Sequence, residues 1–214
     1  MAIPYKTKQP VYLKDPSGRL INETGLGPSY KGDSYTPIIN FPFTPTISII
    51  SNANYSSYDL THTNYQQRAF DSSTNVEFAV TAPMIVRNAE EAEYVYHAAM
   101  FMRAAMKMTF GQDKNPGMPP PVLRFYAHGI YHNVPVQIRD FTWNLDSDID
   151  YVETWIKSGE KSRQSNDADE IKIRVPVSNM FVFSLQSTYS PQSVRENFGV
   201  QDYLDGKIRN KGYV

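Results

Sequence analysis

Two neighbouring runs decide the fold class of this chain: Val122-Leu123-Arg124-Phe125-Tyr126 and Val134-Pro135-Val136-Gln137-Ile138-Arg139. In the second run apolar and polar side chains alternate, which is the period of a half-buried β-strand and directs Val134, Val136 and Ile138 to one face. Gly129 lies between the runs, where it can supply the positive φ of a tight turn. We therefore predict an antiparallel β-hairpin with its turn at Gly129.

The same alternation recurs in four other segments, at residues 46–49, 76–81, 171–177 and 181–185. The break between the last two is expected at Ser178-Asn179-Met180. Pro176 cannot donate a ladder hydrogen bond, so it marks a sheet edge or a bulge. These segments give roughly six or seven strands, and they do not alternate with helices as in a βαβ repeat. They predict a mainly β fold, a β-sandwich or half-barrel.

One long α-helix is predicted over residues 89–110. Asn88 can cap it, Glu91 follows three residues later as in a capping box, and Gly111 can end it. Its charged residues fall in one arc of roughly 140°, and the rest of its circumference is apolar. A helix lying on a single sheet needs a narrower apolar stripe. We therefore expect a second packing surface, either the N-terminal arm or another subunit.

These patterns divide the chain into three parts. Residues 1–43 are rich in proline, glycine and aromatic residues, and they are predicted to form an extended arm docked on the chain's own core or on a neighbouring subunit. Residues 44–190 form the β core, with the helix and a long polar loop at 151–170. Residues 191–214 are predicted to form a short helix, which starts at Ser190-Pro191 and stops at Gly199, and then a polar tail.

Charge and composition exclude several classes of protein. The chain has 214 residues, with 21 Lys and Arg against 22 Asp and Glu, and no cysteine. A face that grips nucleic acid needs clustered Lys and Arg, and disulfides or thiolate chemistry need cysteine. The most apolar stretch, Tyr94 to Met106, is too short to span a bilayer, and the N-terminus lacks an apolar core of signal-peptide length. We expect a soluble protein made in the cytoplasm.

Two patterns begin like metal sites and then break. His128 and His132 have a spacing that suits metal ligands on a helix, but Gly129 places them at a turn. The acidic run at residues 146–150 starts like a calcium loop. However, Tyr151 stands where that loop needs glycine, and Lys157 stands where it needs a bidentate glutamate. We expect surface histidines and a solvated acidic turn, with no metal and no cofactor.

The catalytic patterns are weaker still. Ser57, Asp59 and His62 are close in sequence, but a catalytic triad is assembled from separate parts of a fold, and the chain has no G-x-S-x-G elbow. Gly206-Lys207 lacks the earlier glycine of a phosphate loop. We interpret Ser57, Asp59 and His62 as polar turn residues. We predict that the protein is not an enzyme, with a hydrolase around His62 as an alternative.

One long segment resembles a known family. It runs from Gly117-Met118-Pro119-Pro120-Pro121 into the first strand of the hairpin and ends with the acidic turn and Tyr151-Val152. The preceding helix agrees, with Lys107-Met108-Thr109-Phe110-Gly111 at its end. Over about residues 55–185 the chain is similar to the baseplate-to-tail-tube junction proteins, or tail tube initiators, of contractile-tailed bacteriophages.

The resemblance implies a tail-tube fold, a β-sandwich or half-barrel flanked by a helix, whose copies close into a ring, expected to be a hexamer. Strands would line a channel through which DNA passes without specific binding. Tail tube and baseplate hub proteins would be the partners, in a virion assembled in the host cytoplasm. The chain is shorter than the junction proteins of this family. A junction ring, a hub ring and a tube subunit therefore stay open, and we favour an adaptor ring near the baseplate.

Ring closure brings one surface of a subunit against a different surface of the next copy. We expect apolar residues of the helix and of the 151–170 segment at this interface, namely Tyr94, Phe101, Met102, Tyr151, Trp155 and Ile156. A carbohydrate- or ligand-binding β-sandwich module, with Trp143 and Trp155 as stacking platforms, is the alternative.

Overall fold

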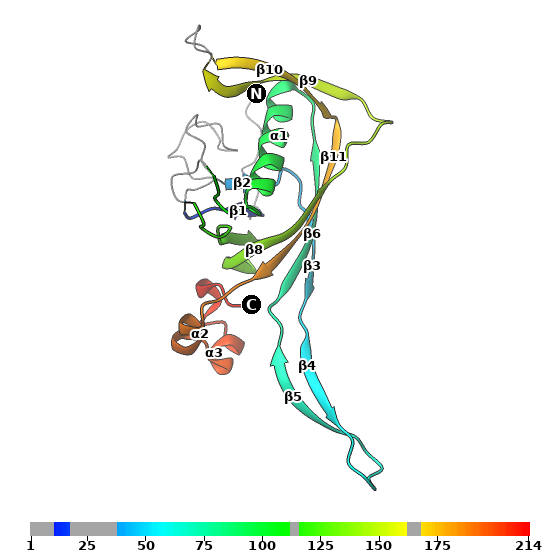
Figure 1. Ribbon diagram of the computed structural model, residues 1–214, viewed down its shortest axis with the longest axis vertical. Helices are drawn as coiled ribbons and strands as arrows, with labels where there is room; N and C mark the ends of the chain where they lie inside the picture. The colour runs from blue at the N-terminus through cyan, green and yellow to red at the C-terminus, as the bar shows by residue number, and fades with distance from the viewer. Residues whose placement is uncertain (1–10, 18–37, 112–115, 162–167) are drawn as a thin grey trace.

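The structure is a computed structural model that describes residues 11–17, 38–111, 116–161 and 168–214. Within these residues the chain is mainly β, with open sheets and three α-helices (Figure 1). The strands are β1 Tyr12–Lys14, β2 Ile38–Asn40, β3 Thr46–Ile50, β4 Ala53–Tyr58, β5 Gln67–Ser73, β6 Glu77–Ile85, β7 Leu123–Ala127, β8 Tyr131–Trp143, β9 Tyr151–Lys161, β10 Ala168–Pro176 and β11 Ser178–Ser187. The helices are α1 Ala89–Ala104, α2 Pro191–Asn197, α3 Val200–Leu204 and the 3-10 helix η1 Arg209–Lys211.

The main sheet has seven antiparallel strands in the described part of the chain, in the order β2-β1-β7-β8-β11-β6-β3. The predicted hairpin is confirmed, because β7 pairs with β8 and Leu123 lies opposite Val136. His128 and Gly129 both have a positive φ at the turn of this hairpin, and the positive φ of Gly129 was predicted from the sequence. β9 with β10, and β4 with β5, form two separate two-stranded sheets.

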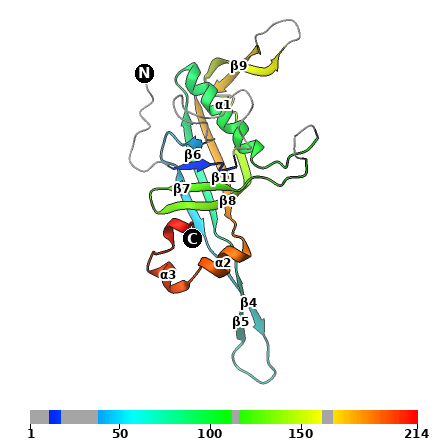
Figure 2. The ribbon, with the colours of Figure 1, turned by 90° about the vertical axis from the view of Figure 1, so that its left-hand side faces the viewer.

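The main sheet is open and strongly curled. From Asn40 at the end of β2 to Thr46 at the start of β3 the chain advances 46 − 40 = 6 residues, which reach at most about 21 Å. In a flat sheet of this strand order β2 and β3 would lie about 29 Å apart. The sheet therefore curves, and Phe41 in this connection stacks on Phe183 of β11 at 5.6 Å. Figure 2 shows the result, with β7 and β8 running across the direction of β6 and β11.

One face of the main sheet carries the hydrophobic core. Phe78 and Val80 of β6 and Phe181, Phe183 and Leu185 of β11 are buried there. α1 and the C-terminal helices lie on this side, and no helix covers the opposite side of β6, β11 and β3 among the described residues (Figure 1). The layer over the core is thus α1, not the second large sheet of the predicted sandwich.

Helix α1 begins as predicted and ends earlier. The Asn88 side chain accepts a hydrogen bond from the Glu91 N–H at 2.8 Å, so the capping residue is confirmed. The helix ends at Ala104, not at 110. The chain beyond it turns back on itself, because the Thr109 N–H donates to the Met118 carbonyl and the Gly117 N–H donates to the Thr109 carbonyl. α2 and α3 add two helices where the sequence predicted one.

The wide apolar circumference of α1 is covered by the chain itself. The helix contacts the main sheet through β8 and also contacts β9 and β10. The Thr154 hydroxyl of β9 donates to the Ala89 carbonyl at 3.1 Å. On another side, the Tyr94 hydroxyl donates to the Asn40 carbonyl at 2.7 Å and accepts from the Asn40 N–H at 2.9 Å. A second packing surface for the helix is therefore confirmed, and it belongs to the same subunit.

The described part of the predicted arm docks on the chain's own core. β1 pairs with β7, β2 pairs with β1, and Leu13 and Ile39 are completely buried. Both strands are three residues long, which is too short for the sequence to show an alternation. The other arm residues, 1–10 and 18–37, lie outside the described residues.

The prediction of a polar loop at residues 151–170 is wrong. Residues 151–161 form β9, which pairs with β10 along nearly its whole length, with Ile171 opposite Ile156. Val152, Thr154 and Ile156 alternate with exposed residues, a strand signal that the polar run after Lys161 obscured. The predicted break at residues 178–180 is also misplaced, because β11 starts at Ser178 and the interruption falls on Val177. Pro176 ends β10 in a two-stranded sheet, where every strand is an edge.

The C-terminal segment is more than a short helix and a polar tail. The predicted cap of α2 is confirmed, because the Ser190 hydroxyl accepts from the Ser193 N–H at 3.1 Å. Ile208 and Tyr213 are buried, and Tyr189 stacks on Tyr213 at 5.1 Å. This apolar anchoring fixes the tail to the base of the main sheet, where η1 contacts β8.

Candidate assembly surfaces

The expected interface residues of α1, with Ile156 of β9, lie inside the subunit. Met102 is completely buried, Phe101 and Ile156 are nearly so, and Tyr94 is half-buried. Each sits against other elements of its own chain, so little of its apolar surface faces outward. Their place at a subunit interface stays a prediction, and their present packing is accounted for by the fold of one copy.

Tyr151 and Trp155 lie on the outer face of β9, and Trp155 is 57% exposed. The Lys172 ammonium of β10 lies 5.9 Å from the centroid of the Trp155 ring. Glu153 binds Lys172 at 2.6 Å and Arg174 at 2.8 Å. Hydrogen bonds from these two cations hold the pKa of Glu153 below its ordinary value. The outer face of the β9–β10 hairpin therefore combines an exposed aromatic ring with an ion-pair network.

The β4–β5 hairpin is a second surface, and it projects from the body of the molecule (Figure 1). Tyr55 and Phe70 meet edge to face at 5.8 Å, and each is 59% exposed. Tyr58 is exposed as well, and every residue of β5 is exposed. An isolated two-stranded hairpin is marginally stable in water. This one extends the β3–β6 pair without any layer over it in the described chain.

This hairpin was not predicted. Ser57, Asp59 and His62 were interpreted as polar turn residues, because serines and asparagines dilute the strand signal around them. The available signal was the spacing of Tyr55, Tyr58 and Phe70 on the two sides of the turn that contains His62. Aromatic residues favour strands, and two such runs around a polar turn are typical of a hairpin.

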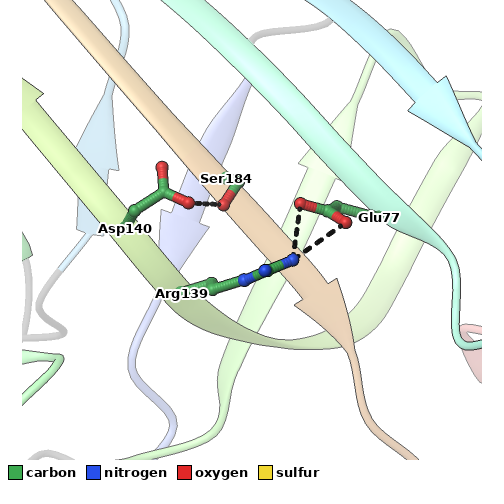
Figure 3. A network of polar contacts seen from close by, with 4 residues as sticks. All are labelled: Glu77, Arg139, Asp140 and Ser184. Carbon is green, nitrogen blue, oxygen red and sulfur yellow. Dashed lines mark hydrogen bonds and ion pairs between the residues drawn. The ribbon is translucent and has the colours of Figure 1, made fainter.

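The uncovered face of the main sheet carries small and polar side chains. We call it the open face and define it by Thr46 and Ser48 of β3, Ala79 and Thr81 of β6, Val182 and Ser184 of β11, and Asp140 and Thr142 of β8. Figure 3 shows the polar contacts on this side, where Glu77, Arg139 and Asp140 are the charged residues drawn. Arg139 reaches Glu77 at 3.3 Å, and the Ser184 hydroxyl donates to Asp140. Among the residues drawn in Figure 3, the one cation, Arg139, is thus paired with a carboxylate.

The candidate catalytic residues lie on the exposed tip of the β4–β5 hairpin. The Asp59 carboxylate accepts a hydrogen bond from Gln66 at 2.7 Å, and His62 has a φ of 65° in the turn. Ser57, Asp59 and His62 are all exposed. Hydrogen bonding to Gln66 and full exposure to water fit the interpretation of polar turn residues.

The candidate metal ligands also have other roles. His132 packs edge to face on Tyr126 at 5.0 Å. The acidic turn is closed by the Tyr151 hydroxyl, which donates to the Asp146 carbonyl at 2.7 Å. Among the described residues, no three His, Asp or Glu side chains gather to hold a metal ion. No helix in the described part of the chain is long and apolar enough to cross a membrane.

Trp143 and Asn179 form a partly buried polar contact beside the connection between β10 and β11. The Trp143 indole N–H donates to the Asn179 side chain at 2.9 Å, and Asn179 donates to the Pro176 carbonyl at 2.7 Å. The Trp143 ring packs on Phe181. Trp143 therefore holds the base of the β9–β10 hairpin and is not placed beside Trp155 as a second stacking platform.

Two partly buried titratable groups have shifted pKa values. Burial raises the pKa of Tyr189 to about 12, and its hydroxyl donates to the Gly212 carbonyl at 2.9 Å. Burial lowers the pKa of His97 on α1, and Glu93 one turn earlier, 3.7 Å away, opposes that shift. The Tyr189 bond ties the C-terminal segment to the end of β11.

No protein-family model matches the chain, and no curated protein matches it.

Proposed function

We propose that the protein is a structural subunit of a contractile phage tail, where copies of it close into a ring, expected to be a hexamer, between the baseplate and the tail tube. In this role it starts or connects the tube, contacts tail tube and baseplate hub proteins, and surrounds DNA without binding it specifically. The sequence resemblance over about residues 55–185 supports this proposal.

The observation that carries the proposal is the β4–β5 hairpin. Tyr55, Tyr58 and Phe70 expose aromatic surface on a hairpin that has no packing layer of its own. Exposed aromatic surface of this kind marks protein interaction sites, and aromatic residues are enriched at the centre of interfaces. A hairpin that projects beyond one subunit reaches the next copy or the next ring.

The open face and the curl of the main sheet support the DNA channel and the half-barrel fold. A curled sheet with its core on one side leaves its other side available to line a passage. On that side Arg139 is paired with Glu77, and the Asp140 carboxylate accepts a hydrogen bond from the Ser184 hydroxyl. A wall without unpaired Lys or Arg forms no phosphate trap, so DNA can slide past it.

The proposal is tested by electron microscopy of the purified chain at high concentration, alone and with a tail tube protein. We expect ring-shaped particles with one copy number, or rings that cap and start tubes. A chain that stays strictly monomeric and joins no tube or baseplate particle contradicts the proposal.

A double variant makes the test specific to the hairpin. Tyr55→Ser with Phe70→Ser removes exposed aromatic area without touching the core, so we expect a folded monomer that fails to assemble. Leu204→Ser is the matched control, because Leu204 is also an exposed apolar residue but lies on α3. If the double variant assembles as the wild type does, the hairpin is not the assembly surface.

A further inference from the structure

Two cations lie directly opposite each other on β1 and β7. Lys14 is in register with Arg124, and both residues are half-buried. Because side chains alternate along a strand, they lie on the face of the sheet away from the completely buried Leu13 and Phe125. Like charges in directly opposite positions destabilise an antiparallel pair. This arrangement becomes favourable when an anion compensates both charges.

No carboxylate forms an ion pair with either cation in the described part of the chain, where the ion pairs involve other residues. Asp15, which follows Lys14, is buried and accepts hydrogen bonds from the Ser17 N–H at 2.9 Å and the Ser17 hydroxyl at 2.6 Å. Arg124 donates to the Asn133 carbonyl at 3.4 Å, and a guanidinium has five N–H donors. The two cations thus keep donors for a carboxylate from outside the chain.

An aromatic stack borders the two cations on the same face. Tyr12 and Tyr126 are the next residues on this face of β1 and β7, and their rings stack at 4.4 Å with 12° between their planes. The Tyr126 hydroxyl donates to the Asn133 side chain at 3.2 Å. These contacts fix the strand pair and hold the two cations side by side. We define the basic patch by four residues: Lys14, Arg124, Tyr12 and Tyr126.

An acidic counterpart lies beyond the other end of β8. The three aspartates of the turn at residues 146–150 are exposed, and none of them takes part in an ion pair in the described chain. From Pro135, which is in register with Arg124, to Trp143 at its end, β8 advances 143 − 135 = 8 residues, about 26 Å along the strand. Figure 1 shows this turn projecting on the right and β1 on the left. One copy therefore cannot bring its own acidic turn to its own basic patch.

We propose that the acidic turn of one copy binds the basic patch of the next copy. This inference rests on the proposed ring and names a contact that closes it. A contact between two different surfaces of identical copies is heterologous, and it generates a ring when the rotation closes. Charge complementarity favours a second copy as the occupant, because the described chain carries one surface of each sign without a partner. Complementary charges also fix which surfaces meet and in which orientation.

The basic patch is separate from the open face. Both lie on the side of the main sheet away from the core, but the patch is on β1 and β7, and the open face is on β3, β6, β11 and the far end of β8. The curl of the sheet lies between them. The proposed contact therefore places these cations against a neighbouring copy and not against DNA in the channel.

Exchanging the charges tests this contact in the full-length chain. One variant reverses the patch by Lys14→Glu with Arg124→Glu. Another reverses the turn by Asp146→Lys, Asp148→Lys and Asp150→Lys. We expect each variant alone to self-associate at least about tenfold more weakly than the wild type, because like charges then meet. A mixture of the two variants has opposite charges at every contact, so we expect rings in which the two alternate. Analytical ultracentrifugation and electron microscopy measure both results.

A matched control reverses two other exposed cations, by Arg103→Glu with Lys107→Glu near the end of α1. It changes the net charge as much as the patch variant does, so equal weakening by both overturns the inference. Circular dichroism checks that the variants are folded. If the patch variant does not fold, Lys14→Gln with Arg124→Gln replaces it. The turn variant changes exposed side chains alone and tests the contact independently.

The other outcomes separate this inference from the proposed function. A turn variant that forms rings as the wild type does, or a mixture that assembles no better than each variant alone, overturns the inference while the proposed function stands. A wild type that forms no homo-oligomer, alone or with a tail tube protein, rejects both.

Fluorescence anisotropy with a short DNA duplex at about 150 mM salt tests the other occupant. We expect no binding that depends on the patch. If the wild type binds the duplex and the patch variant does not, while assembly of the variant is unchanged, the patch is a nucleic-acid site and the inference is wrong.

Discussion

Two hairpins at opposite ends of the molecule are built alike and supported differently. β9–β10 places one face on α1, where Thr154 bonds the first turn of the helix and Ile156 is buried. β4–β5 has no layer on either face in the described chain, and its aromatic residues are exposed. The same local element is thus part of the monomer's core at one end and a bare projection at the other.

This difference indicates where each hairpin obtains its stability. Three or more strands, or packing against a helix, are needed for a hairpin to be stable by itself. β9–β10 meets that condition within one subunit. β4–β5 meets it only through its connection to β3 and β6, or through a neighbouring molecule. We therefore expect mutations in the first hairpin to change the stability of the monomer and mutations in the second to change assembly.

The largest expected effect on stability is that of Ile156→Ala. It removes buried methyl groups between β9 and α1, and such truncations cost about 2–4 kcal/mol of the free energy of unfolding. Trp155→Ala, on the outer face of the same strand, should cost no more than about 1 kcal/mol. Urea unfolding followed by circular dichroism measures both. If the two variants lose the same stability, the hairpin is not held by its inner face.

A smaller effect on stability is expected from Phe70→Ala in β4–β5. It removes one edge-to-face contact with Tyr55 at an exposed site, and such pairs contribute about 0.5–1.5 kcal/mol. The loss should lie at or below the lower end of that range, because both rings are more than half exposed to water. The same urea experiment checks it, and a loss as large as that of Ile156→Ala would mean that β4–β5 belongs to the monomer's cooperative core.

The smallest effect is the response of the β9–β10 outer face to acid. The pKa of Glu153 is lowered by hydrogen bonds from Lys172 and Arg174, so its stabilising contribution is present above the unfolded pKa and is lost as the pH falls through the folded pKa. Carboxyl NMR titration should place the pKa of Glu153 below its ordinary value. Lys172→Met should raise that pKa, whereas Lys207→Met, far from this face, should leave it unchanged. A Glu153 pKa that does not respond to Lys172→Met would show that the ion pair is not formed in solution.

Strong periodicity made part of the fold predictable. The alternation at residues 134–139 predicted β8, and Asn88 with Glu91 predicted the start of α1, because both signals act over a few neighbouring residues. These local signals did not predict where α1 ends. Beyond Ala104 the chain turns back on itself and is held by a hydrogen bond between Thr109 and Met118, which are nine residues apart.

The remaining errors come from tertiary contacts. β1 and β2 are three-residue strands. β1 pairs with β7 and β2 pairs with β1, so no local pattern marks them. The wide apolar arc of α1 correctly predicted a second packing partner. Sequence alone could not choose between the arm and another subunit. It also did not predict that β9–β10, expected to be a polar loop, packs on the helix. Of the six expected interface residues, Tyr151 and Trp155 lie on the outer face of β9, and the other four point inward. On β9 the side of each residue follows from strand register, and on α1 it depends on which elements cover the helix.

Hydrogen exchange in the free and the assembled protein tests the central claim most directly. The account predicts that the amides of residues 53–58 and 67–73 exchange fast in the monomer and become protected in assembled particles, while those of 151–156 are protected in both. Assembled particles in which the β4–β5 amides still exchange as fast as in the monomer would contradict the account.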